Sequence, residues 1–191
     1  MTATVRRTLD TAEPARHALL GLLLDGPRHG YDLTRSFAPG TPLGAVMRLG
    51  DSNLYAQLTR LERDGLIVGE VRESGVRPPR RVYHLTEAGR EAALRWIDEP
   101  VARPRDILLD FPLKLYLARH VGPDRAAALV ARQRAFIATY LARLEEDVAR
   151  LEEDIPDAEK GADTAFIALV REGRIARTRA ILAWLDRCAV S

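Results

Sequence analysis

A seven-residue pattern repeats near the carboxyl end of the chain, as ARLEEDV at 142–148 and ARLEEDI at 149–155. Its apolar positions alternate steps of four and three residues, which is the spacing of a helical seam. The seam consists of Ile137, Leu141, Leu144, Val148, Leu151 and Ile155. The chain therefore contains one long helix in this region.

This seam covers under three heptads, which is marginal for an isolated coiled coil. We expect it to pack against residues 163–188, a second helical segment with Phe166, Val170 and Ile181 among its apolar positions. A long seam at the end of a small domain leaves apolar surface that one helix covers poorly. We therefore expect a homodimer that forms through this region, with a helical hairpin within one chain as the alternative.

Two prolines, Pro100 and Pro104, mark a boundary near the middle of the chain, because a helix rarely continues through such a stretch. Beyond it, helical spacing runs over 105–117, and Gly122-Pro123-Asp124 opens the long helix with proline in its first turn. We expect a mainly helical fold with a small β-hairpin, divided into residues 1–98 and residues 99–191.

The first domain is predicted to contain three helices followed by a hairpin. A nearly apolar first helix covers 14–24, and a second covers 30–37 and buries Tyr31 and Leu33. The loop over 38–50 is rich in glycine and proline, and its path cannot be inferred from the sequence.

The third helix, over 53–63, is expected to be capped by Asp51 or Ser52. At about 100° per residue, its side chains separate into two faces. The apolar stripe toward the core consists of Leu54, Leu58 and Leu61, and the opposite side carries Asn53, Ala56, Gln57 and Arg60, flanked by Tyr55. Asn and Gln can bond adenine, Arg can bond guanine, and Ala leaves room for a thymine methyl group. This face predicts a helix that reads the major groove of DNA, with a merely solvated face as the alternative.

A β-hairpin follows the third helix, with strand character over 67–72 and 80–85. Five arginines and two glutamates lie between positions 72 and 90, and this net charge of +3 equals the whole excess of the first half of the chain. The arginines at the tip, which have no acidic residue nearby, are Arg77, Arg80 and Arg81. We interpret this hairpin as a wing that contacts the DNA backbone or minor groove, with a solvated turn as the alternative.

The whole chain carries a formal charge of only +2, which excludes a uniformly basic protein. The single cysteine, Cys188, excludes an internal disulfide, and with four scattered histidines it leaves no thiolate site for zinc. The apolar run 18–24 is too short to span a membrane, and Asp10 and Glu13 precede it where a secretory signal has positive charge. We expect a cytoplasmic protein with no cofactor and no membrane partner. The sequence contains neither HExxH nor GxSxG, so we do not expect an enzyme.

Several stretches match a known family in their order and spacing. They are ALLGLL at 18–23, PRHGYDL at 27–33, NLY at 53–55 continuing to LERDGLI at 61–67, and YHLTEAGR at 83–90. Together these resemble the PadR-type transcriptional regulators. The stretch DFPLKLYL at 110–117 resembles the opening of the helical carboxyl-terminal domain found in longer members of that family.

The resemblance implies a homodimeric winged-helix repressor or activator that binds an inverted-repeat operator in double-stranded DNA. It assigns Ser52, Asn53 and Tyr55 to the operator-contacting segment, and residues 75–81 to the wing tip. The family includes members that release DNA on binding small aromatic molecules, so Trp96 at the hinge is a candidate effector-binding residue. Trp184 is a weaker candidate for the same role. For both tryptophans, packing in the hydrophobic core is the alternative. A winged-helix adaptor that binds another protein is the alternative function.

Overall fold

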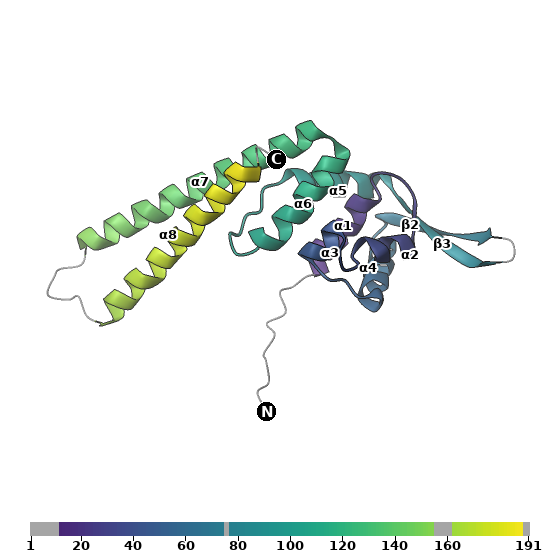
Figure 1. Cartoon of the computed structure of the whole chain (residues 1–191), viewed down its shortest axis with the longest axis horizontal. Coiled ribbons are helices and arrows are strands. Elements are labelled where there is room, and N and C mark those ends of the chain that lie inside the picture. Colours follow the sequence, from purple (N-terminus) through teal and green to yellow (C-terminus); the bar gives the residue numbers. More distant parts are fainter. Residues whose placement is uncertain (1–11, 75–76, 155–161, 189–191) are drawn as a thin grey trace, which may run out of the picture.

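The computed structural model describes residues 12–74, 77–154 and 162–188, with the backbone alone described at 72–74, 77–80, 151–154 and 162. The chain is mainly helical with one small antiparallel sheet, as predicted. A winged-helix domain occupies one end, and a long pair of helices extends away from it (Figure 1). The helices are α1 (Ala12–Leu22), α2 (Gly30–Ser36), α3 (Pro42–Val46), α4 (Asp51–Arg63), α5 (Glu87–Asp98), α6 (Ile107–Val121), α7 (Pro123–Asp154) and α8 (Ala162–Cys188). The strands are β1 (Arg28–His29), β2 (Ile67–Ser74) and β3 (Arg77–Leu85).

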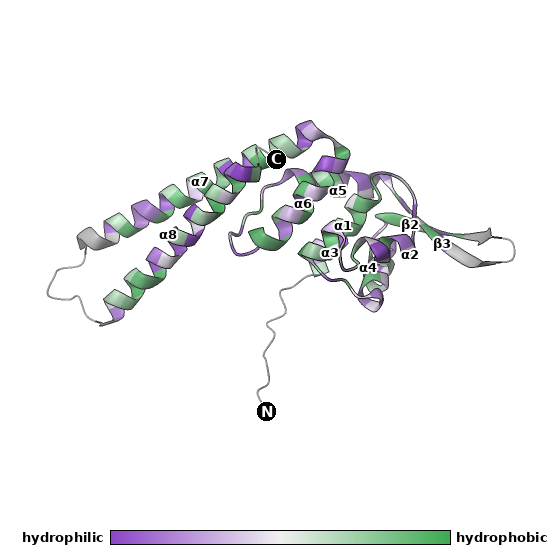
Figure 2. Cartoon of the chain, in the orientation of Figure 1, coloured by the Kyte–Doolittle hydropathy of each residue, from purple (hydrophilic) through white to green (hydrophobic). Residues whose placement is uncertain are grey.

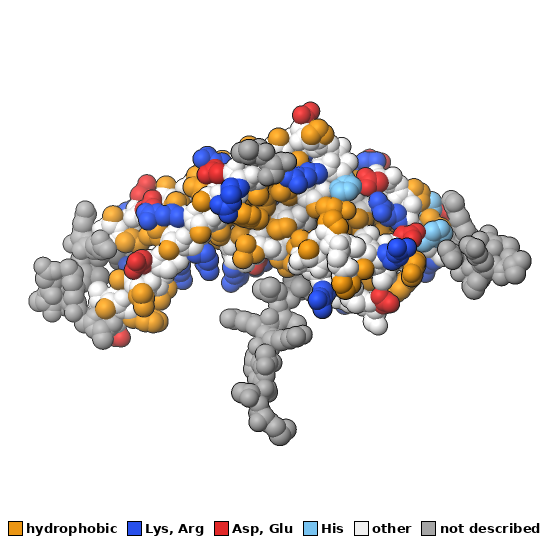
Figure 3. Space-filling view, viewed as in Figure 1, with side chains coloured by type: hydrophobic (Ala, Val, Ile, Leu, Met, Phe, Trp, Pro, Cys, Tyr) orange, Lys and Arg blue, Asp and Glu red, His pale blue; other side chains and the backbone are white. Residues whose placement is uncertain are grey.

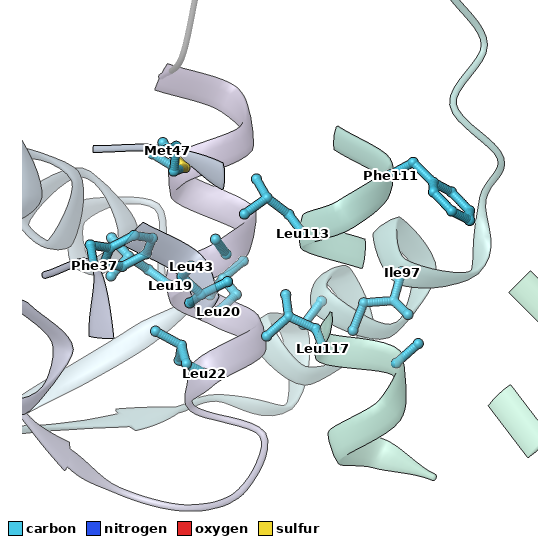
Figure 4. Close-up of a cluster of buried hydrophobic side chains, with 14 of the residues drawn as sticks. Leu19, Leu20, Leu22, Phe37, Leu43, Met47, Ile97, Phe111, Leu113 and Leu117 are labelled. Carbon is cyan, nitrogen blue, oxygen red and sulfur yellow. The ribbon is translucent and has the colours of Figure 1, made fainter. Parts of the chain in front are cut away.

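Helix α1 forms the centre of the winged-helix core because apolar residues dominate its second half. Leu19 and Leu20 are fully buried, and α4, α5 and α6 all pack against this helix. Leu113 and Leu117 reach from α6 toward α1 (Figure 4). A β-carbon at Gly21 would collide with the side chain of Leu117, so glycine at this position allows the close approach of α6. The first helix after the predicted domain boundary therefore shares the winged-helix core.

The β2–β3 hairpin extends away from the helical body (Figure 1), as predicted for a wing. Its strands are longer than expected and reach Ser74 and Arg77, and β1 adds a short third strand beside β3. Thr86 caps the start of α5, because its hydroxyl oxygen accepts a hydrogen bond from the backbone N–H of Gly89 at 3.0 Å. The same hydroxyl donates to the carbonyl oxygen of Gly65 at 2.8 Å, which fastens α5 to the end of α4.

The start of the third helix differs from the prediction. Helix α4 begins at Asp51, and Gly50 occupies the cap position with no side-chain hydrogen bond, so neither Asp51 nor Ser52 is the cap. The preceding loop also contains α3, where the Thr41 hydroxyl accepts a hydrogen bond from a backbone N–H of the first turn. The first turn of α4 therefore presents backbone N–H groups without a side-chain cap.

The predicted burial of Tyr31 is wrong. Its side chain is 64% exposed, whereas Leu33 is buried as expected and Phe37 is buried as well. Leu33 and Phe37 are four residues apart and share one face of the short α2 segment. Position 31 is two residues before Leu33, about 200° around the helix, and so lies on the side away from the core.

Polar contacts hold α7 against the connection between α5 and α6. The buried side chain of Gln133 accepts a hydrogen bond from the backbone N–H of Val101 at 2.6 Å and donates to its carbonyl oxygen at 3.2 Å. Asp98, at the end of α5, forms ion pairs with Arg125 at 2.8 Å and Arg132 at 3.3 Å. The predicted boundary after residue 98 therefore falls in a connection that α7 fixes by side-chain contacts.

Helices α7 and α8 form an antiparallel pair, and the seam of α7 faces α8 as predicted. Ile137 is fully buried, and Leu141, Leu144 and Val148 are half-buried. The side chain of Leu151 and the whole of Ile155 lie outside the described residues. Two ion pairs also join the helices, Arg179 to Glu145 at 2.6 Å and Arg134 to Asp186 at 2.5 Å.

The start of α8 leaves a row of apolar side chains uncovered. Helices α7 and α8 diverge toward this end (Figure 1), and hydrophobic residues continue along α8 to its first turns (Figure 2). Orange hydrophobic side chains are visible at this end of the surface in Figure 3. The exposed residues are Phe166 at 65%, Ile167 at 47%, Leu169 at 64% and Val170 at 39%.

Candidate nucleic-acid interface

Helix α4 presents one open face beside the hairpin. Leu54, Leu58 and Leu61 are fully buried against the core, as predicted. The residues of the open face, each exposed as expected, are Ser52, Asn53, Ala56 and Arg60, with Tyr55 46% exposed beside them. This face combines amide, hydroxyl, methyl and guanidinium groups on one rigid helix, which are the groups that can read base edges in a major groove.

Gln57 does not belong to this open face, so its predicted placement is wrong. The side chain is 3% exposed, and its amide nitrogen donates to Oδ1 of Asn53 at 3.1 Å. Position 57 follows Leu54 by three residues and precedes Leu61 by four, so it lies on the edge of the buried stripe. The bond orients the Asn53 amide and leaves the two N–H donors of that amide directed elsewhere. Gln57 therefore orients the Asn53 side chain from a buried position next to the open face.

Tyr55 rests directly on the start of α2. A β-carbon at Gly30 would lie 3.0 Å from both Cε1 and the hydroxyl oxygen of Tyr55. Such a spacing is tighter than ordinary contact, so glycine at position 30 makes room for the ring. The ring is held between the two helices while almost half of its surface stays exposed. Tyr55 is thus placed rigidly at the edge of the open face.

The acidic residues at the end of α4 are paired with arginines, two of which lie on other elements. Asp64 pairs with Arg16 of α1 at 2.6 Å and with Arg63 at 3.2 Å. Burial alone would raise the pKa of Asp64, but hydrogen bonds from Arg63 and Arg16 hold it below its usual value. Glu62 pairs with Arg81 at 2.7 Å. Arg60 has no acidic partner among the side chains that the structure describes, so its positive charge remains available on the open face.

The structure describes the side chain of one of the three arginines predicted at the hairpin tip, and there it differs from the prediction. Arg81 was expected to have no acid nearby, and its ion pair with Glu62 makes that expectation wrong. The acid comes from α4, nineteen positions earlier, so proximity along the sequence did not reveal it. The backbone of Arg80 pairs with that of Arg72, and Arg77 pairs with Ser74. The side chains of Arg77 and Arg80 lie outside the described residues, so their role at the tip stays a prediction.

Gly69, which was not singled out from the sequence, lies beside the ion pair between Arg81 and Glu62. It lies in the middle of β2 opposite Tyr83, and a β-carbon there would collide with Nε of Arg81 and with Oε1 of Glu62. A glycine inside a strand often marks a place where other groups approach the backbone closely. A glycine between residues of strand character could therefore have indicated that other side chains approach β2 at this position.

Both tryptophans are partly buried and pack against the hydrophobic core. The Trp96 ring stacks on His17 with centroids 5.0 Å apart, and Nζ of Lys114 lies 4.5 Å from the centre of the same ring. Trp184 meets Phe111 edge to face at 5.5 Å. These contacts give Trp96 a packing role, and its predicted role in binding an effector stays a prediction.

A separate groove of about 450 Å³ lies on the surface of α7 next to the interdomain connection. Phe136 and Tyr140 contribute its aromatic side chains, and Arg132 and Arg143 its positive charges.

Within the described ranges, no group of three or more histidine, cysteine or acidic residues is arranged to hold a metal ion. In the same part of the chain, no helix is both long and apolar enough to cross a membrane.

Two family models match the chain on either side of the predicted boundary. Residues 19–95 match the transcriptional regulator PadR-like family, and residues 109–190 match the virulence activator alpha C-term model. The chain is 28% identical to the negative transcriptional regulator PadR of Bacillus subtilis over 118 residues, which cover 62% of this chain and 64% of that protein. That match spans less than two thirds of the relative's length. The chain is also 26% identical over 184 residues to the probable transcriptional regulator Rv1176c of Mycobacterium tuberculosis, covering 91% and 94% of the two chains.

Solved structures of the same Bacillus subtilis protein are similar to this chain. The complex of PadR with operator DNA has 23% sequence identity and a TM-score of 0.44, covering 92% of this chain and 95% of that one. The complex with p-coumaric acid has 24% identity and a TM-score of 0.41, covering 95% and 96%. The match over residues 19–95, which contains the open helix face and the hairpin, agrees with the resemblance seen in the sequence. The chain is thus similar to the transcriptional regulator PadR-like family over residues 19–95.

Proposed function

We propose that this regulator binds double-stranded DNA with α4 in the major groove and the β2–β3 hairpin against the neighbouring backbone. The observation that carries the proposal is the open face of α4, where Asn53, Ala56 and Arg60 are exposed together. The acids at the end of the helix, Glu62 and Asp64, are paired with arginines and oppose DNA binding less than free carboxylates would. Phosphate contacts from the hairpin supply affinity, and base contacts from α4 supply sequence preference.

The functional unit in this proposal is a homodimer that acts as a repressor on an inverted-repeat operator. The apolar row on α8 from Phe166 to Val170 favours a second copy as its cover, because exposed apolar patches often mark protein interfaces. A dimer with twofold symmetry reads two half-sites of opposite orientation. We assign repression, and not activation, because one relative is named a negative transcriptional regulator.

Selection of genomic fragments by the purified protein tests this function. The recovered fragments are expected to share an inverted repeat with half-sites about 10 base pairs apart, or a multiple of that spacing. Transcription from a recovered promoter is expected to rise in cells that lack the protein. The same selection is carried out with the double variant Asn53→Ala with Arg60→Ala. Its recovered fragments should no longer share a motif, although the variant should retain non-specific DNA binding. Failure of the wild type to retain any fragment at about 50 mM salt would favour the protein-adaptor alternative.

A small aromatic acid is the effector that this proposal includes. The α7 groove offers the stacking faces of Phe136 and Tyr140 beside the guanidinium group of Arg143. One solved structure of the Bacillus subtilis relative is titled as a complex with p-coumaric acid. Addition of p-coumaric acid is expected to release the selected DNA, and Arg143→Ala should blunt that release. DNA binding that is insensitive to the acid at millimolar concentration would contradict an effector of this class.

A further inference from the structure

An ion pair joins the recognition helix α4 to the root of the hairpin. Nη2 of Arg81 on β3 lies 2.7 Å from Oε1 of Glu62 in the last turn of α4. The guanidinium group also lies 5.6 Å from the centre of the Tyr83 ring. The polar contact of Arg81 is therefore with α4 and its aromatic contact is within the sheet, while 51% of the side chain stays exposed.

Gly69 provides the space in which this pair sits. It lies on β2 directly opposite Tyr83, and Arg81 is on the same face of β3 two residues away. Any side chain at position 69 would collide with both Arg81 and Glu62. The missing side chain therefore leaves room between strand and helix that the ion pair fills.

The pair lies next to the point where the backbone pairing of β1 with β3 ends. Strand β1 pairs with β3 at Val82 and Tyr83, and beyond Arg81 the described backbone of β3 pairs only with β2. Four further residues of β3 extend to Arg77, a distance of roughly 13 Å at about 3.3 Å per residue. A tilt of about 10° at the root would move that end by roughly 2 Å, which is enough to break a hydrogen bond to DNA.

We propose that Arg81 and Glu62 are positioning residues, which fix the angle of the hairpin relative to α4 so that both elements meet DNA together. The proposal rests on the proposed function and replaces the direct DNA contact that the sequence predicted for Arg81. Because Glu62 engages the guanidinium group of Arg81, the proposal assigns this arginine to positioning and not to a phosphate contact. A glutamate close to the DNA surface thereby increases affinity, which is the opposite of its electrostatic effect on a phosphate backbone.

The sign of the Glu62→Gln effect tests the proposal. Binding to a wild-type-selected fragment is measured for Glu62→Gln, Arg81→Gln and the double variant between about 50 and 200 mM salt. We expect each single variant to bind about three- to tenfold more weakly, the double variant to bind no more weakly than the singles, and the salt slope to stay at the wild-type value. Glu91→Gln removes one exposed acid from α5 and serves as the charge-matched control, which should bind as tightly as the wild type or slightly more tightly.

Two results would overturn the inference while leaving the proposed function intact. One is a Glu62→Gln variant that binds DNA as tightly as Glu91→Gln does. The other is an Arg81→Gln variant whose salt slope falls by about one unit, which would assign Arg81 to a phosphate. Thermal unfolding checks that the variants fold, and because this ion pair is partly exposed, its removal should leave the midpoint almost unchanged. A wild type that binds no DNA would instead overturn the proposed function itself, and the positioning role with it.

Discussion

Lys114 is a buried cation at the junction of α5 and α6. Its ammonium group donates hydrogen bonds to the carbonyl oxygens of Trp96 and Glu99, the latter at 2.8 Å, and so satisfies the carboxyl end of α5. Burial lowers the pKa of Lys114 to about 8, although the nearby carboxylates of Asp110, Glu99 and Asp98 act in the opposite direction. The charged lysine therefore carries a desolvation cost in the folded protein.

This cost predicts a pH dependence of stability. The lysine loses its proton near pH 8 in the folded state and near pH 10.5 in the unfolded state. Between these values the unfolded state binds more protons, so the stability of the wild type relative to Lys114→Met should rise with pH, by roughly 1 kcal/mol per unit. Urea unfolding of both proteins from pH 7 to 9.5 measures this difference. A difference that stays constant over that range would contradict the burial argument.

Gln57 and Arg60 are one helical turn apart and have separate roles in this structure. Gln57 is buried and bonded to Asn53, whereas Arg60 is exposed. Gln57→Ala is therefore expected to lower the free energy of unfolding by about 1–2 kcal/mol. Arg60→Ala should change it by less than about 0.5 kcal/mol and should weaken DNA binding instead. Urea unfolding and DNA titration of both variants separate the two roles, and equal stability losses would argue against this assignment.

Most individual elements could be predicted from the sequence, because each leaves a local signal. The repeat at 142–155 predicted α7, and the strand character over 67–72 and 80–85 predicted the hairpin. The start of α4 was missed because polar residues at 51 and 52 resemble caps, and only the backbone shows Gly50 in that place. Gln57 was misplaced because a polar residue on the edge of an apolar stripe becomes buried when a neighbouring side chain accepts its hydrogen bond.

Helix α5 illustrates how packing overrides helix propensity at one position. A β-carbon at Gly89 would collide with the backbone carbonyl of Leu66, whereas Ala88 beside it is exposed. Gly89→Ala should destabilise the protein by about 2 kcal/mol, although alanine is the better helix former. Ala88→Gly should cost about 0.5–1 kcal/mol for the opposite reason. Chemical unfolding of the two variants compares these preferences, and a stabilising Gly89→Ala would contradict the described packing.

At the scale of the whole molecule, the near-neutral charge conceals a local arrangement. The formal charge of +2 combines a hairpin region of net charge +3 with an acidic repeat in the other half. The structure adds pairings between distant segments, such as Arg16 with Asp64, which spacing along the chain cannot reveal. It also shows that α8 covers much of the α7 seam, so the uncovered apolar surface lies on α8.

This surface gives a prediction for the assembly. The wild type is expected to sediment at micromolar concentration with about twice the chain mass of 21.3 kDa. The double variant Phe166→Asp with Leu169→Asp should sediment as a single chain, because charges at these positions oppose burial. Leu108→Asp is a control, since Leu108 is 72% exposed on α6, away from the α8 row. A monomeric wild type, or a dimer unaffected by the double variant, would contradict the α8 interface.

The central claim is that the open face of α4 reads the sequence of DNA. Fluorescence anisotropy of wild type and Asn53→Ala, on a selected site and on a scrambled fragment of equal length, tests it most directly. The claim predicts a roughly 5- to 150-fold loss of affinity on the selected site and almost none on the scrambled fragment. An equal loss on both fragments, or no loss on either, would contradict it.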